Sequence, residues 1–180
     1  AVLVTIVTRT ATRLMDNVID VFDFPVQHVT DVAKKNRRIG LGIMGFAEML
    51  YKLGIQYNSE AGRAMAERAM EFVNAEAHKM SQQLAKEKGT FGLWKDSVWG
   101  KKRIKMRNAA LTTVAPTGSI SMFTDCSSGI EPNFALSYVK QYKDGHQYRY
   151  FNRHFEKAIQ KLHLSQKQKD QVTDEILKTG

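Results

Sequence analysis

The sequence contains a single cysteine, Cys126, among 180 residues. One thiol cannot form a disulfide within the chain, and the five histidines do not have the spacing of a zinc site. No apolar run reaches the roughly 18 to 20 residues that a transmembrane helix needs. Internal repeats and low-complexity segments are missing too. These absences exclude disulfide scaffolds, zinc fingers, transmembrane proteins and solenoids. They predict a cytoplasmic protein with no metal ligands and no membrane contact.

The composition indicates a globular chain. Hydrophobic residues make up 43% of the sequence and charged residues 25%, which is ordinary for a globular domain. The length fits one domain, residues 1–180, or one slice of a larger domain. Twenty-seven basic against 18 acidic side chains give a formal charge of +9, which favours anionic partners such as phosphates or nucleic acid. The chain begins with Ala1 and runs straight into helical periodicity, so we expect an internal portion of a longer protein.

The first half, residues 1–89, is predicted to be mainly helical. An apolar stripe predicts a first helix that ends before Pro25, followed by a linker over 30–38. A second stripe over 39–53 ends at Gly54, and a third helix begins at Asn58 or Ser59 and stops at Gly89. The first stripe is Leu3, Val7, Ala11, Leu14, Val18 and Val21, and the buried face of the third helix is predicted to be Met65, Ala69, Phe72, Val73, Ala77, Met80 and Leu84.

The second half is predicted to mix strands and helices. Residues 90–107 form a basic loop that contains aromatic side chains. The uncharged run 108–115 predicts a strand buried on both faces, and a second strand is predicted over 134–142, before Asp144 and Gly145. Helices are predicted over 148–162 and over about 165–178. Residues 108–180 therefore read as strand, loop, strand and helices, which makes the fold class α/β.

Three glycines, Gly40, Gly42 and Gly45, match the dinucleotide-binding pattern Gly-x-Gly-x-x-Gly. That pattern requires a hydrophobic strand before the glycines, and here the preceding residues are basic. We therefore interpret the glycines as small residues that permit close helix packing, and we reject a Rossmann fold.

The segment that follows the predicted strand has the chemistry of a phosphate site. Pro116 ends the strand, and Thr117, Gly118, Ser119, Ile120 and Ser121 then supply hydroxyls and a glycine where a helix could begin. Unpaired N–H groups in a first helical turn, together with hydroxyl donors, bind anions. The alternative is that Thr117 only caps a helix and the serines are surface residues. No Walker lysine is present, which excludes a P-loop.

Two side chains beyond this segment could take part in chemistry. Cys126 could be a nucleophile, but no histidine partner is apparent in the sequence, so we expect an inert buried thiol. Glu131 could be a catalytic carboxylate, although a hydrogen-bond acceptor within a loop is the simpler interpretation. Two basic stretches, 101–107 and 140–153, could together bind nucleic acid, but no recognition fold accompanies them and solvated charge is the preferred interpretation.

Four segments together resemble the large, catalytic subunit of ribonucleotide reductase. They are residues 12–20, 36–47, 116–121 and 127–132, in that order, and the resemblance extends to about residue 155. Pro-Thr-Gly-Ser-Ile followed by Cys-Ser-Ser-Gly-Ile-Glu-Pro looks most like the adenosylcobalamin-dependent class. Many iron-dependent relatives carry an acidic, hydroxyl-rich version of the first motif.

The resemblance implies a fold and an activity. The fold is part of a ten-stranded α/β barrel of the radical-enzyme type. The activity is reduction of the ribose 2′-hydroxyl of a ribonucleotide by a cysteine thiyl radical and a cysteine pair. The implied cofactor is adenosylcobalamin; the alternative is a radical supplied by a di-iron partner subunit. The implied partners are the ribonucleotide, a thioredoxin-like or glutaredoxin-like reductant and further copies of the same protein. A diphosphate and a triphosphate substrate fit equally.

The sequence departs from the family in its thiols. The family's radical loop, Asn-x-Cys-x-Glu, is missing, and one cysteine cannot supply three thiols. We expect the radical loop upstream of Ala1, no catalytic residue in this chain and no reductase activity from the chain alone. The resemblance assigns substrate-phosphate binding to Pro116, Thr117, Gly118, Ser119, Ile120 and Ser121, with Glu131 and Cys126 in supporting positions. The alternative from another class is a nucleotide-binding or nucleic-acid-binding module without radical chemistry.

Overall fold

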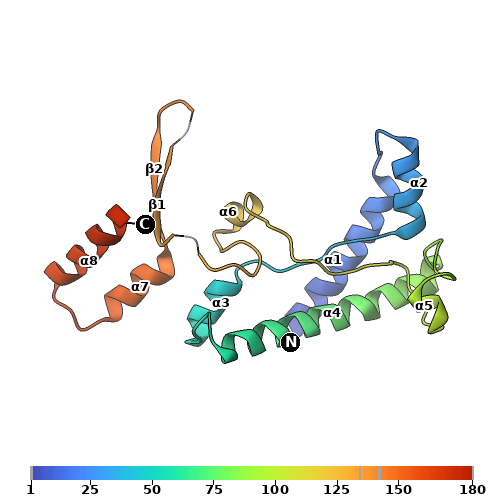
Figure 1. Cartoon of the computed structure of the whole chain (residues 1–180), viewed down its shortest axis with the longest axis horizontal. Coiled ribbons are helices and arrows are strands. Elements are labelled where there is room, and N and C mark those ends of the chain that lie inside the picture. The colour runs from blue at the N-terminus through green and yellow to red at the C-terminus, as the bar shows by residue number, and fades with distance from the viewer. Residues whose placement is uncertain (1, 134, 142, 180) are drawn as a thin grey trace.

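The computed structural model describes residues 2–133, 135–141 and 143–179. In chain order its elements are α1 (Val2–Val21), α2 (Gln27–Asn36), α3 (Phe46–Leu53), α4 (Glu60–Lys88), α5 (Val98–Lys101), α6 (Ile120–Thr124), β1 (Ser137–Gln141), β2 (Gln147–Phe151), α7 (Arg153–Lys161) and α8 (Gln166–Thr179). Figure 1 shows an elongated arrangement, with α1, α2 and α5 toward one end and the hairpin, α7 and α8 at the other. The segments α3 and α6 lie between the two ends.

The long helix α4 runs along the molecule from beside α3 toward α5 (Figure 1). As predicted, it begins after Ser59, whose hydroxyl accepts a hydrogen bond from the Gly62 N–H at 3.0 Å, and it ends at Gly89. Four residues of its predicted apolar face are buried, namely Val73, Ala77, Met80 and Leu84. The core beside it comprises Ile19, Ile39, Ala77, Phe91, Met106 and Leu111. The basic loop 90–107 is ordered by its aromatics, and the Trp94 indole donates to the Ile104 carbonyl at 2.7 Å.

The apolar stripe of α1 does not face this core. Leu3, Leu14 and Val21 are exposed, whereas the buried positions of α1 are Thr8, Thr12, Asp16 and Ile19. The predicted first helix is confirmed as α1, but its apolar stripe is not its buried face. The reason is electrostatic: Asp16 must reach the buried Arg37, and this ion pair at 2.9 Å orients the helix.

Residues 39–45 are not helical, so the predicted helix over 39–53 is wrong in its first half. The Ile39 N–H donates to the Ala110 carbonyl at 3.0 Å, and Leu41 forms a parallel bridge with Thr112. Helix α3 begins only at Phe46 and ends at Gly54, as the sequence indicates. A Cβ on Gly42 would lie 2.7 Å from the Thr113 carbonyl oxygen, so these glycines permit close packing between extended chains and not between helices.

The predicted strand 108–115 is wrong as a strand, because it forms only an isolated bridge at Thr112, and it is only partly covered. Leu111 is buried, but Val114 is exposed, so burial on both faces is wrong there among the described residues. The linker predicted over 30–38 is also wrong, because α2 occupies most of it. This helix ends at Arg37, which has a left-handed φ of 49°.

The C-terminal third contains an antiparallel hairpin of β1 and β2, in which Ser137 is opposite Phe151. The predicted strand 134–142 is confirmed over Ser137–Gln141, whereas residues 134 and 142 lie outside the described residues. The predicted helix 148–162 is wrong at its start, because residues 147–151 form β2. The turn at Asp144 and Gly145 returns the chain to pair with β1. Helix α7 begins only after Asn152, whose side chain caps it.

Candidate functional site

The predicted phosphate-binding residues form an exposed turn between the extended segment 108–115 and α6. Thr117 adopts a left-handed φ of 49°, which is costly for a residue with a Cβ. The main-chain N–H groups of Gly118, Ser119 and Ile120 donate to no other atom of the described residues. A Cβ on Gly118 would meet nothing within 4 Å. Three donors are thus free on an open surface.

Helix α6 itself contributes little to this surface. It has five residues, and Ser119 at its N-cap position makes no side-chain capping bond. Thr117 is not the cap, since its hydroxyl accepts from the Gly129 N–H at 2.8 Å. The capping alternative for Thr117 is therefore wrong. Because a helix dipole sums over its peptide units, the individual N–H groups matter more here than the dipole.

A second turn, residues 126–130, lies against this loop and holds it. The Ser128 and Ser121 hydroxyls hydrogen-bond at 3.0 Å, and the Cys126 N–H donates to the Ser121 carbonyl at 3.2 Å. Gly129 has a φ of 48°, and a Cβ there would lie 3.0 Å from the Ala115 carbonyl oxygen. The two turns therefore form one packed unit, which we call the loop pair (residues 116–121 and 126–130).

Glu48 on α3 anchors the loop pair, and sequence reasoning did not find it. The Ser127 N–H donates to both carboxylate oxygens of Glu48 at 3.0 Å, and the Ser127 hydroxyl donates at 2.7 Å. Burial opposes the charge of this side chain, but hydrogen bonds outweigh burial and lower the pKa of Glu48. The bonds from Ser127 contribute most, and the Glu48 backbone and the Asn133 side chain add to them. No sequence motif links a helical glutamate to a serine 79 residues away.

The two supporting residues, Cys126 and Glu131, have different surroundings. Cys126 is half-buried, and its Sγ lies 3.1 Å from the Thr124 hydroxyl. Glu131 is exposed, and its N–H donates to the Ser128 carbonyl at 2.9 Å, but its carboxylate accepts no hydrogen bond within the described parts of the chain. The thiol is thus less buried than expected, and the Glu131 side chain is not a loop acceptor here.

The Cys126 side chain opens into a cavity of about 390 Å³ that Arg153 and His154 also line. Arg153 forms an ion pair with Asp125 at 3.2 Å, and the Tyr150 hydroxyl donates to the same carboxylate at 2.9 Å. Burial and this hydrogen bond raise the pKa of Tyr150 to about 12. Asp125 therefore connects the end of α6 to β2 and α7.

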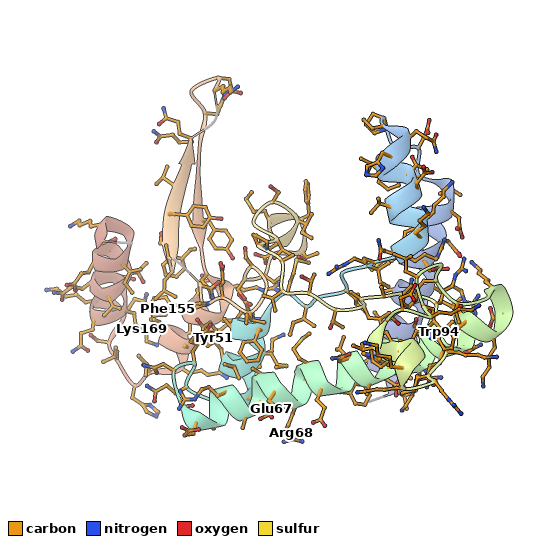
Figure 2. All side chains as sticks on the ribbon, turned by 45° about the vertical axis from the view of Figure 1, so that its right-hand side comes forward. Tyr51, Glu67, Arg68, Trp94, Phe155 and Lys169 are labelled. Carbon is orange, nitrogen blue, oxygen red and sulfur yellow. The ribbon has the colours of Figure 1, made fainter. Side chains whose placement is uncertain are left out.

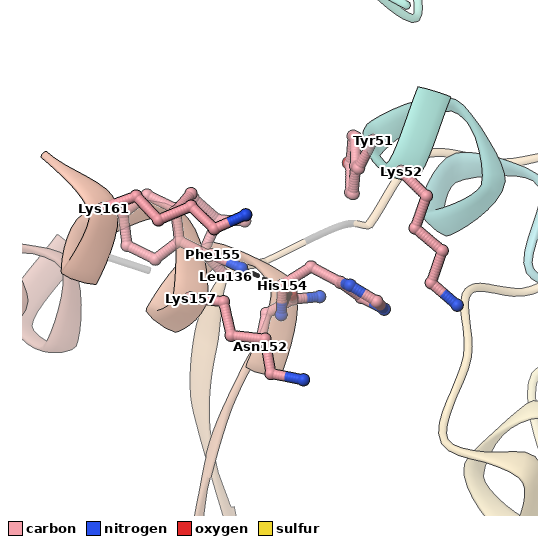
Figure 3. Close-up of a pocket in the computed structure, with 9 residues that line it drawn as sticks. Tyr51, Lys52, Leu136, Asn152, His154, Phe155, Lys157 and Lys161 are labelled. Atoms are coloured by element: carbon pink, nitrogen blue, oxygen red, sulfur yellow. Dashed lines mark hydrogen bonds between the residues drawn. The ribbon is translucent and has the colours of Figure 1, made fainter. Parts of the chain in front are cut away.

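A larger cavity of about 740 Å³ lies between α3 and α7 (Figure 3). Tyr51 and Phe155 line it from these two helices (Figure 2). Figure 3 shows the His154 ring on the side of Lys52. Burial and the charge of Lys52 lower the pKa of His154, and its Nε2 is a buried atom without a hydrogen bond among the described residues. The remaining lining residues are Leu136, Asn152, Lys157, Ala158 and Lys161.

The two basic stretches do not form one surface. Residues 101–107 lie near α5, and residues 140–153 lie in the hairpin at the opposite end of the molecule (Figure 1). Arg107 is also occupied, because its guanidinium pairs with Asp16 at 3.4 Å and donates to the Lys88 carbonyl at 3.1 Å. The geometry therefore gives no support to a combined nucleic-acid interface.

Within ranges 2–133, 135–141 and 143–179, no three His, Cys, Asp or Glu side chains gather where they could hold a metal ion. Over the same residues, no helix is both long enough and apolar enough to cross a membrane.

Comparison with known proteins returns one family. Residues 4–179 match the family described as "Ribonucleotide reductase, barrel domain". A "Vitamin B12-dependent ribonucleoside-diphosphate reductase" of Thermoplasma acidophilum is 45% identical over 171 residues, which is 95% of this chain and 22% of that protein. A protein of the same description from Mycobacterium tuberculosis is 42% identical over 134 residues, covering 74% of this chain and 19% of that protein.

A more distant relative carries a different description. A "Ribonucleoside-diphosphate reductase subunit alpha" of Chlamydia muridarum is 31% identical over 172 residues, which covers 75% of this chain and 16% of that protein. The chain therefore spans about a fifth of the length of the curated relatives it matches.

Proposed function

The chain belongs to the ribonucleotide reductase barrel-domain family, and on that premise we propose that it is the portion of a longer ribonucleotide reductase that binds the substrate phosphates. The observation that carries the proposal is the open turn at residues 116–121. Its three free N–H groups, on Gly118, Ser119 and Ile120, face solvent from the segment that resembles the family's phosphate loop.

In this proposal the N–H groups and the Ser119 hydroxyl hold the phosphate oxygens. Neutral donors that the loop pair holds in place bind an anion without the rearrangement that long lysine side chains would need. Gly118 leaves the space that an approaching phosphate requires, because no protein atom lies within 4 Å of its missing Cβ. Phosphate is remote from the ribose 2′-hydroxyl that is reduced, so binding here positions the substrate and the chain supplies no catalytic group.

The ten-stranded barrel is also part of the proposal. Residues 39–41 and 110–113 pair in parallel, and such strands need a long crossover between them. Helices α3 and α4 provide it, which supports an assignment of the two segments as neighbouring strands of the barrel.

The proposed cofactor of the complete protein is adenosylcobalamin. Support comes from the relatives in Thermoplasma and Mycobacterium, which are described as vitamin B12-dependent and share 45% and 42% identity with the chain. The Chlamydia protein, described as a subunit alpha, shares 31% identity. We assign none of the described residues to this cofactor. The step proposed for this chain is phosphate binding alone.

The partners of the complete protein follow from the same reasoning. We expect a ribonucleoside diphosphate as the substrate, as the names of the relatives indicate, and a dithiol protein as the reductant. Self-association and a cytoplasmic location remain predictions. The chain by itself is expected to reduce no ribonucleotide, because its one cysteine cannot supply the radical thiol and the reducing pair.

An activity assay on the complete protein tests the reductase proposal. The protein is supplied with a ribonucleoside diphosphate, a dithiol and adenosylcobalamin, and deoxyribonucleotide is measured. Product that depends on the cobalamin and needs no second subunit is the expected result. Product that instead requires a di-iron subunit would support the iron-dependent class. No product under either condition, together with DNA binding that falls steeply with salt, would favour a nucleic-acid-binding module.

The phosphate loop has its own test in the same protein. Ser119→Ala removes one donor, and Gly118→Val fills the open space, so both variants are expected to raise KM for the diphosphate by about threefold to thirtyfold. Cobalamin binding is the control and is expected to stay the same. Unchanged KM in both variants would remove the phosphate-binding role.

A further inference from the structure

We propose that Glu48 is a positioning residue for the phosphate loop, which it controls through Ser127. The proposal rests on the proposed function of residues 116–121 as the phosphate site. It starts from an unusual feature of this carboxylate. Glu48 is only 7% exposed, yet no Lys or Arg side chain in the described residues forms an ion pair with it. The other buried acidic residues, Asp16 and Glu76, do have basic partners at 2.9 and 2.7 Å.

A buried charge without a counterion is costly unless hydrogen bonds satisfy it. Ser127 gives the Glu48 carboxylate its main hydrogen bonds, because its N–H reaches both oxygens and its hydroxyl reaches one of them. The Asn133 side chain and the Glu48 backbone contribute less. The Ser127 carbonyl in turn accepts from the Gly45 N–H at 2.9 Å. The beginning of α3 therefore holds Ser127 by both its donors and its acceptor.

The next two residues transmit this hold to the phosphate loop. Ser128 hydrogen-bonds to Ser121 at 3.0 Å, and the Gly129 N–H donates to the Thr117 hydroxyl at 2.8 Å. Both contacts depend on the register of the turn. A shift by one residue would place Gly129, which has no hydroxyl, where Ser128 now contacts Ser121. Glu48 thereby fixes the two ends of the segment that displays the free N–H groups.

Thr117 needs this support because its left-handed backbone is strained. Such a conformation is unfavourable for a residue with a Cβ, and it persists only where the surroundings hold it. When Ser127 is released, Thr117 can relax and the N–H groups of residues 118–120 lose their common direction. The expected effect is weaker phosphate binding, with no direct effect on the groups that react.

The test compares Glu48→Gln with Glu60→Gln in the complete reductase. Glu60 is a matched control because its side chain is 91% exposed on α4 and the charge change is identical. Glu48→Gln is expected to raise KM for the ribonucleoside diphosphate about tenfold, with kcat within about twofold of wild type. The dissociation constant of inorganic pyrophosphate should rise in parallel. Glu60→Gln should leave all three values unchanged.

A double variant tests whether Glu48 acts through Ser127. Ser127→Ala alone is expected to raise KM about threefold, and added to Glu48→Gln it should raise KM no further. Glu48→Asp, which keeps the charge, should recover part of the lost affinity. A purely structural role would lower the active fraction and kcat without changing KM, and that result would overturn the proposal.

The outcomes separate this proposal from the one it rests on. If Ser119→Ala raises KM and Glu48→Gln does not, the positioning role fails and the phosphate site stands. If neither variant changes KM, the phosphate site itself fails. Should Glu48→Gln not fold, Ser127→Ala decides, because it removes only the 2.7 Å hydroxyl bond, and an unchanged KM there refutes the role of Glu48.

Discussion

At the residue scale, the buried Asp16 connects more of the chain than any other side chain described above. Its Oδ1 accepts from the Arg37 guanidinium at 2.9 Å and from the Asn108 amide at 3.0 Å, and its Oδ2 lies 3.4 Å from Arg107. These partners belong to the end of α2 and to the start of the extended segment that leads to the phosphate loop. One carboxylate thus joins α1 to the two segments, 39–41 and 110–113, that we propose as neighbouring barrel strands.

We predict that Asp16→Asn lowers the free energy of unfolding by about 3 to 5 kcal/mol, because it leaves the buried Arg37 without its main counterion. Asp20→Asn is the matched control. Asp20 pairs with the same Arg37 at 2.7 Å but is 43% exposed, so its loss should cost about 0 to 1 kcal/mol. Urea unfolding of both variants measures the difference. Equal losses would show that burial does not distinguish the two ion pairs.

A second prediction concerns pH and Glu48. Its pKa is lowered in the folded chain, so its ionised form stabilises the fold above the unfolded pKa, and this contribution is lost as the pH falls through the folded pKa. The stability difference between wild type and Glu48→Gln should therefore be largest near neutral pH and shrink in acid. A difference independent of pH would contradict the assignment.

Glu48 and Asp16 also show where sequence reasoning stops. The caps at Ser59 and Gly54 were predictable because their partners are within a few residues. The buried face of α1 was not predictable, because its Asp16 pairs with Arg37 and Arg107 from distant parts of the chain. The residue types of 116–121 predicted a phosphate site, which stays a prediction, but they gave no sign of the turn and the carboxylate that hold this segment.

At the element scale, the parallel pairing of 39–41 with 110–113 depends on glycine. Gly42→Ala should destabilise the fold by about 1 to 3 kcal/mol, since its Cβ would lie 2.7 Å from the Thr113 carbonyl oxygen, a backbone atom. Gly118→Ala is the control for stability, because its Cβ would meet nothing within 4 Å. Thermal melting compares them. If both substitutions are tolerated, the two segments are not packed as closely as described.

This pairing also explains an error in the sequence prediction. Residues 39–53 show apolar residues at helical spacing throughout, but only 46–53 are helical. Residues 39–41 instead pair with a segment some 70 residues later, a contact that no local pattern records. The helix prediction for residues 148–151 was wrong for a similar reason, since these residues pair with β1 across a turn.

At the scale of the whole molecule, the exposed apolar surface is large. Leu3 and Val21 of α1 are 71% and 82% exposed, and Phe123 of α6 is 89% exposed. Apolar surface of this extent usually meets another protein surface. We therefore predict that the isolated chain self-associates as its concentration rises. Salt should strengthen the association, because it screens the repulsion expected from a net charge of +9.

Sedimentation velocity over a range of concentrations measures this association. A variant with Leu3→Gln and Leu14→Gln should stay monomeric and equally helical, because both side chains are exposed. Thr10→Gln, an exposed polar position on the same helix, is the control and should behave as wild type. A wild-type chain that is monomeric at every concentration would refute the prediction.

The long sequence separation of the contacts around the loop pair has a consequence for folding order. Glu48 and Ser127 are 79 residues apart, and Asp16 and Asn108 are 92 residues apart. Closing such long loops costs chain entropy, whereas α4 is built from contacts between near neighbours. We expect the helix to form early in refolding and the phosphate loop to gain its binding geometry last. Ligand binding would then report the final step of assembly.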